Sequence, residues 1–169
     1  MTRQDFLTKW LVYGVALLPI WFLETYVLNR FPVFGVSPLL LPLAAVTVAV
    51  LEGGAAGAGY GLFVGVLCDA LYATAGAMTF GLMLLGAAAG MTAQFLLRQN
   101  LLGCYLCSTG ALVLMDACRI LWRLFWGKAE LAPMLGVALP ELLWSLAFLP
   151  LVYCIFSWVH RRTQFATLF

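Results

Sequence analysis

The sequence predicts an all-α membrane protein that folds as one polytopic bundle of about six transmembrane helices. Of its 169 residues, 64% are hydrophobic and only 9% are charged, and the mean hydropathy is +1.03. A water-soluble domain of this size cannot bury so large an apolar fraction. Apolar runs recur along the whole chain with short breaks between them. We therefore expect residues 1–169 to form a single integral-membrane domain, with no separate soluble domain.

Six apolar runs define the expected spans. The first follows Arg3 and Lys9 and has no small-residue cleavage site behind it, so we expect a retained helix rather than a signal peptide. It is expected to kink at Pro19, and the last span to be interrupted at Pro140 and Pro150. The second is short for a crossing, which takes about 20 residues, so we expect an unusual tilt or a non-helical start. The spans are expected at residues 10–28, 36–51, 55–73, 77–97, 101–126 and 134–159.

The distribution of basic residues predicts the orientation in the membrane. Six spans place both termini on one side. That side carries most of the lysines and arginines outside the spans, namely Arg3, Lys9, Arg98, Arg161 and Arg162, whereas the other side carries Arg30 and Lys128. Because basic loops stay in the cytoplasm, both termini are expected to be cytoplasmic.

A ladder of glycines marks the third expected span. Its members recur every fourth residue, and Asp69 takes the next step of the same spacing. On an α-helix this spacing keeps residues on one face. In lipid, a face of small residues lets another backbone approach closely. Together with two glycines of the fourth span, the ladder is a predicted packing or partner interface, which comprises Gly53, Gly57, Gly61, Gly65, Gly86 and Gly90.

Five ionisable residues lie inside the expected spans. From the orientation and a rise of about 1.5 Å per residue, all five fall roughly 5–15 Å inside the outer boundary. We therefore expect one intramembrane polar cluster, made of Glu24, Asp69, Asp116, Arg119 and Glu141. Two interpretations remain open. The cluster is either an outward-opening pocket for a small solute or ion, or a buried network that orients helices and seats a partner helix. The second is favoured, because charges near the boundary are tolerated without a binding role.

Other motifs carry no specific chemistry. A net charge of +2 without a basic stripe gives no support to nucleic-acid binding. Cys104 and Cys107 have CxxC spacing but no second pair, so helix packing is favoured over a metal site. His160 adjoins two arginines and is expected to be an interfacial anchor. No nucleotide-binding loop, catalytic triad or metal-ligand set is present in the sequence, so we expect no enzymatic activity, cofactor or metal.

The segment Tyr60–Asp69, which reads YGLFVGVLCD, together with Gly76 and the glycine-spaced run from Leu82 to Gly90, resembles the signature of the MreD family of rod shape-determining membrane proteins. The carboxylates of Glu24 and Asp116 and the length of the chain also fit this resemblance. Cys68 departs from it, since the family more often has an aromatic residue there, and the pair formed by Asp116 and Arg119 has no fixed counterpart in the family.

The resemblance implies a non-enzymatic scaffold of the cell-wall elongation machinery in the bacterial cytoplasmic membrane. The implied partners are MreC, RodA and a class B penicillin-binding protein, near the MreB filament. The family is itself similar to the S-components of energy-coupling-factor vitamin transporters, so a substrate-binding S-component is the alternative. The bulky residues of the first span, where S-components carry small ones, favour the scaffold. A solute channel is a third class, for which glycine-tight packing leaves little room.

Overall fold

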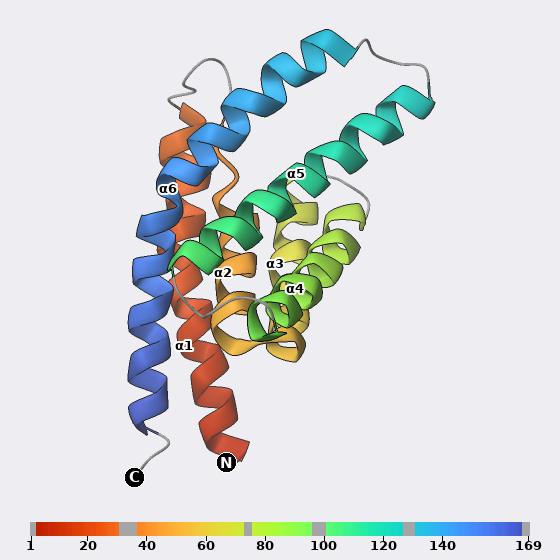
Figure 1. The fold of residues 1–169 in the computed structure, drawn as a ribbon. Helices are drawn as coiled ribbons and strands as arrows, with labels where there is room; N and C mark the ends of the chain where they lie inside the picture. The colour runs from red at the N-terminus through yellow and green to blue at the C-terminus, as the bar shows by residue number, and fades with distance from the viewer. Residues whose placement is uncertain (1–2, 31–36, 73–75, 96–100, 127–130, 167–169) are drawn as a thin grey trace.

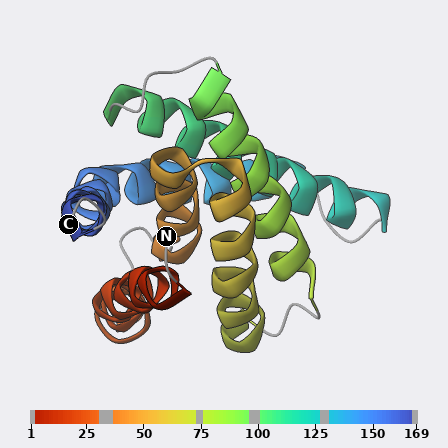
Figure 2. The same ribbon diagram turned by 90° about the horizontal axis from the view of Figure 1, so that it is seen from below.

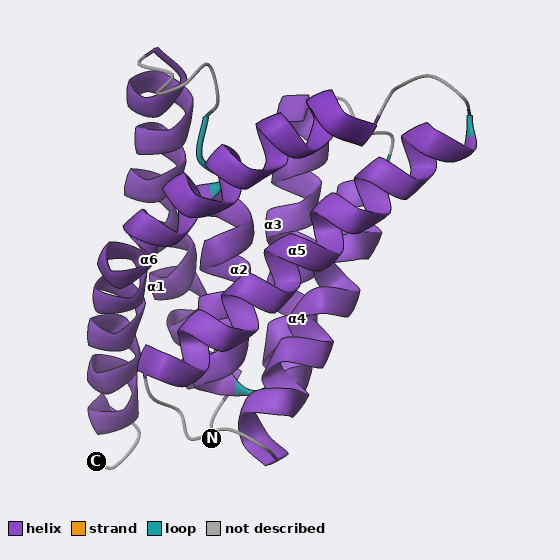
Figure 3. Cartoon of the chain, turned by 45° about the horizontal axis from the view of Figure 1, so that its top comes forward, coloured by secondary structure: helices purple, strands orange, loops and turns teal. Residues whose placement is uncertain are grey.

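The computed structural model describes residues 3–30, 37–72, 76–95, 101–126 and 131–166. The described chain is helical apart from short connections (Figure 3). The first helix, α1 (Arg3–Phe22), continues into a π-helical turn, η1 (Leu23–Val27), and a 3-10 turn, η2 (Leu28–Arg30). The helices are α1 (Arg3–Phe22), α2 (Leu40–Glu52), α3 (Gly54–Tyr72), α4 (Ala77–Phe95), α5 (Leu101–Phe125) and α6 (Leu131–Ala166). All except α2 are long and apolar enough to cross a membrane. The predicted class, a polytopic helical membrane bundle, is therefore confirmed.

Two expectations about single spans need correction. The second helix begins at Leu40 rather than at residue 36, which lies outside the described residues, and it has only 13 residues. Residues 37–39 are not helical, so the expected non-helical start is present. The last span is not interrupted, because α6 continues as one helix through Pro140 and Pro150. Figure 1 shows that α6 bends instead. The expected loop residues Arg98 and Lys128 lie outside the described residues.

The short helix α2 forms the centre of the molecule. Every residue from Leu40 to Leu51 is buried, and each is apolar except Thr47. A helix that is apolar all round has no polar side to turn outward, so it is stable only when it is covered on every face. The helix packs against α1, α3, α4, α5 and α6. Figure 2 shows it enclosed between its neighbours, and its 13 residues span about 20 Å.

Around this centre, the helices form two subassemblies. The antiparallel pair of α3 and α4 has the most extensive contact in the molecule. The second half of α5 and the first half of α6 run side by side, obliquely to α1, and their joined ends project beyond the other helices (Figure 1). We call this α5–α6 hairpin, residues 113–126 and 134–145, the oblique arm. The start of α1 and the end of α6 lie at the opposite end of the molecule (Figure 1).

The outer surface is strongly apolar. Large side chains such as Phe80, Phe95 and Phe125 are 63%, 82% and 90% exposed. In each of the five long apolar helices, a third or less of the most apolar stretch is buried inside the molecule. Water-soluble monomers do not expose apolar surface on this scale, so this surface faces lipid.

Candidate functional site

The five ionisable residues of the expected cluster are not joined by one network of ion pairs. Glu24 and Asp69 each accept hydrogen bonds from neighbouring helices, and the remaining three form ion pairs with one another. The structure thus brings together Asp116, Arg119 and Glu141.

Glu24 holds the start of the central helix. Its side chain is 3% exposed and lies in the π-helical turn η1. One carboxylate oxygen accepts the backbone N–H of Leu41 at 2.7 Å, and the other accepts the hydroxyl of Tyr72 at 2.6 Å. The first N–H groups of a helix have no partner within that helix and favour negative charge. Ser145 accepts the N–H of Leu39 at 2.9 Å, so η1 and α6 both supply caps to α2.

Asp69 performs the same task for α4. It lies near the end of α3, and its carboxylate accepts the backbone N–H groups of Met78 at 3.2 Å and Thr79 at 2.9 Å. The hydroxyl of Thr79 also donates to it. These N–H groups belong to the first turn of α4. The carboxylate that ends the glycine ladder is therefore a helix cap that fixes the turn between α3 and α4.

The other three ionisable residues form an ion-paired triad on the oblique arm. Arg119 lies 3.7 Å from Asp116 and 3.6 Å from Glu141, measured between nitrogen and carboxylate oxygen. The triad lines a cleft of about 330 Å³ between α5 and α6, to which Arg123 also contributes. The rest of the lining is apolar and consists of Ile120, Met134, Val137 and Ala138.

The glycine ladder lies at helix contacts inside the chain. A Cβ atom added to Gly61 or Gly65 would overlap the backbone of α4, at Leu82 and Thr79 respectively. One added to Gly57 would lie 2.6 Å from the carbonyl oxygen of Gly86.

Gly90 of α4 packs in the same way against the backbone of Gly53 and Gly54. Gly53 also has a positive φ of 96°. These close approaches leave α3 and α4 in backbone contact, with no room on this face for a partner helix.

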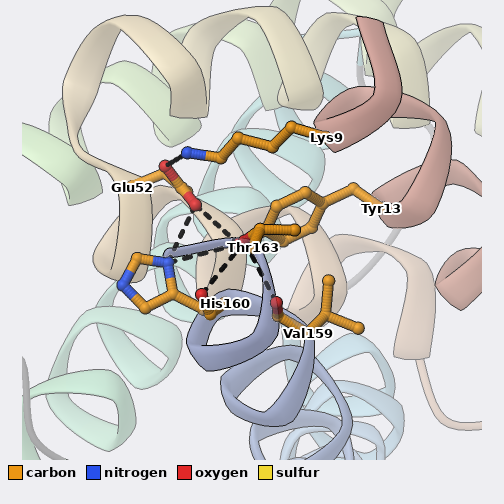
Figure 4. Close-up of polar contacts among 6 residues, drawn as sticks. All are labelled: Lys9, Tyr13, Glu52, Val159, His160 and Thr163. Carbon is orange, nitrogen blue, oxygen red and sulfur yellow. Dashed lines mark hydrogen bonds and ion pairs between the residues drawn. The ribbon is translucent and has the colours of Figure 1, made fainter. Parts of the chain in front are cut away.

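A further polar cluster, not anticipated from the sequence, joins three helices (Figure 4). It lies toward the start of α1 and the end of α6, the end of the molecule where Figure 1 marks the termini. Its centre is Glu52, at the end of α2. Tyr13 donates to the Glu52 carboxylate at 2.6 Å, and His160 Nδ1 lies 2.8 Å from the same oxygen. Lys9 forms an ion pair with the other oxygen. We call these four residues the Glu52 hub. The sequence contains one indication of this hub: the predicted orientation places Lys9, Glu52 and His160 on the same side of the membrane.

The Glu52 hub keeps its carboxylate ionised. Burial by itself raises the pKa of Glu52, but hydrogen bonds from His160, Lys9 and Tyr13 outweigh that effect and lower it to about 2. The hub therefore holds a stable negative charge against two potential cations. The hub can anchor the ends of α1, α2 and α6. Glu52 stays ionised near neutral pH and does not change its charge there.

Cys104 and Cys107, the pair with CxxC spacing, pack against neighbouring helices. Cys104 is buried, with its sulfur 3.6 Å from the Thr47 hydroxyl, and Cys107 lies 3.9 Å from the Ala89 carbonyl. Within the part of the chain that the structure describes, no three His, Cys, Asp or Glu side chains are grouped closely enough to hold a metal ion.

Comparison of the chain with protein-family models, with curated proteins and with solved structures finds no match.

Proposed function

We propose that this protein is a non-enzymatic membrane scaffold of the MreD type. In this proposal it lies in the bacterial cytoplasmic membrane with both termini in the cytoplasm. It assists cell-wall elongation by binding MreC, RodA and a class B penicillin-binding protein, near MreB. The similarity of the segment Tyr60–Asp69 to the MreD signature supports the family, although no family model matches the chain.

One structural observation favours a scaffold over a solute carrier. The carboxylates of Glu24 and Asp69 are occupied by helix N–H groups and hydroxyls of the same chain. A solute that used them as ligands would have to displace the caps of α2 and α4. Both carboxylates thus hold helices of the same chain in place, which is the role expected of intramembrane charges in a structural component.

The alternative function, a substrate-binding component related to S-components of energy-coupling-factor transporters, has one observation in its favour. The cleft between α5 and α6 carries two carboxylates and two arginines, and its 330 Å³ is large enough for a small solute. It is formed by two helices of the oblique arm, however, and the carboxylates of Glu24 and Asp69 do not contribute to it.

Affinity purification separates the two functions. The full chain, tagged and extracted from its native membrane in mild detergent, is expected to retain MreC, RodA or a penicillin-binding protein, identified by mass spectrometry. The variant Gly59→Leu serves as a control for the effect of a substitution in α3. Gly59 faces open space, so the variant should keep the fold and retain the same proteins as the wild type. Recovery of ATP-binding-cassette ATPases with a coupling subunit, in place of cell-wall proteins, would contradict the scaffold and support the alternative.

A further inference from the structure

The cleft of the oblique arm holds two carboxylates and two arginines, and one of the arginines has no ion-pair partner among the side chains that the structure describes. Asp116 and Glu141 share Arg119 as their ion-pair partner. Arg123 lines the same cleft but makes no ion pair with any side chain that the structure describes. It lies four residues beyond Arg119, about 6 Å farther toward the end of α5. The ion-paired triad therefore lines the inner end of the cleft, and the guanidinium of Arg123 lies near its outer end.

The surroundings of Arg123 place it at the level of the lipid headgroups. Trp122 and Trp126, on the same stretch of chain, are 68% and 61% exposed. Tryptophan collects at the membrane–water interface, and α5 ends at Phe125. The cleft lies between α5 and α6, in an arm that projects beyond the other helices (Figure 1). We therefore expect lipid to reach it.

We propose that this cleft binds the phosphate of a phospholipid, with Arg123 as the principal ligand. The guanidinium suits a phosphate because it presents several N–H donors in a planar fork. Beneath it, the apolar lining of Ile120, Met134 and Val137 accommodates the glycerol and the first acyl carbons. Carboxylates at the inner end repel an anion that enters more deeply, so the phosphate is held near the outer end. This lipid site goes beyond the proposed scaffold function and does not depend on it.

Native mass spectrometry of the full-length protein in detergent tests this site. The probes are a phosphatidylglycerol and a diacylglycerol with the same acyl chains, which lacks the phosphate. We expect phosphatidylglycerol to bind and diacylglycerol to bind much less. Arg123→Gln should weaken phosphatidylglycerol binding about fivefold, the effect of one basic residue on an anionic lipid. Arg123→Lys, which keeps the charge, should retain most of the binding.

Arg30→Gln provides the matched control. Arg30 is exposed at the end of η2 and does not line the cleft. Its loss should leave lipid binding unchanged, and gel filtration should show all variants as equally folded. Equal binding by wild type and Arg123→Gln would overturn the proposal, as would equal binding of the two lipids. Tight binding of free sn-glycerol 1-phosphate would also overturn it, because the cleft would then recognise a soluble phosphate rather than a lipid.

Discussion

At the scale of single residues, two of the acidic side chains inside the bundle, Glu24 and Asp69, act on helix ends. Glu24 and Asp69 each accept backbone N–H groups from the first turn of another helix. A carboxylate in this position combines a hydrogen bond with a favourable interaction with the helix dipole. The spacing of the sequence predicts neither partner, because a cap across two helices depends on the turn between them. What the sequence does show is that these residues are too costly in a membrane to be incidental.

Substitution of Asp69 distinguishes capping from a need for charge. Asp69→Asn keeps one acceptor oxygen for the N–H groups of Met78 and Thr79, whereas Asp69→Leu keeps none. We expect the leucine variant to lose on the order of 1–2 kcal/mol of stability and the asparagine variant distinctly less. Thermal unfolding in detergent measures both. Equal losses would indicate that the cap requires the negative charge itself and not only a hydrogen-bond acceptor.

At the scale of elements, the glycine ladder illustrates what a sequence pattern can and cannot establish. The spacing of four predicts a close helix contact, but it does not say which helix makes the contact. The structure places α4 there, with the backbone of Leu82 against Gly61. The second span illustrates the reverse case. Its length alone suggests an incomplete crossing, while its complete burial depends on how five other helices surround it.

Glycine substitutions on the two faces of α3 test this contact. Gly61→Leu and Gly65→Leu place side chains against the α4 backbone and should destabilise the protein by about 1–3 kcal/mol each, or prevent folding. Gly59→Leu, on the same helix, meets no atom within 4 Å and should be tolerated. Yield of monodisperse protein and its unfolding temperature in detergent provide the measurement. Normal assembly of both ladder variants would show that α3 and α4 do not pack this closely.

At the scale of the whole molecule, polar contacts hold both ends of the bundle. The Glu52 hub ties α1, α2 and α6 at one end, and the caps of α2 and α4 fix the other. The class of fold can be predicted from composition and hydropathy, because each helix of the bundle corresponds to an apolar run of the sequence. The grouping of the charges cannot, because equal depth in the membrane says nothing about which sides of the helices face one another. Of the five ionisable residues, Asp116, Arg119 and Glu141 form ion pairs with one another.

The Glu52 hub predicts a pH dependence of stability. The Glu52 pKa falls from 4.5 to about 2 in the folded protein. A lowered acidic pKa contributes stability that is fully present above about pH 4.5 and is lost as the pH falls toward 2. We expect Glu52→Gln to cost on the order of 2 kcal/mol at neutral pH. The difference in free energy of unfolding between Glu52→Gln and the wild type should decrease as the pH of the detergent samples is lowered from 4.5 toward 2. A difference that stays constant with pH would contradict a stabilising role for the ionised Glu52 carboxylate.

The complete enclosure of α2 separates the length of this helix from the thickness of the bilayer. A helix in contact with lipid must match the hydrocarbon layer of about 30 Å, or tilt or deform its surroundings. Because α2 is buried along Leu40–Leu51, it meets protein on every side and is exempt from that requirement. Only the five longer helices therefore need to match the thickness of the bilayer. They can tilt or shift to do so around α2, which has no contact with lipid along its buried length.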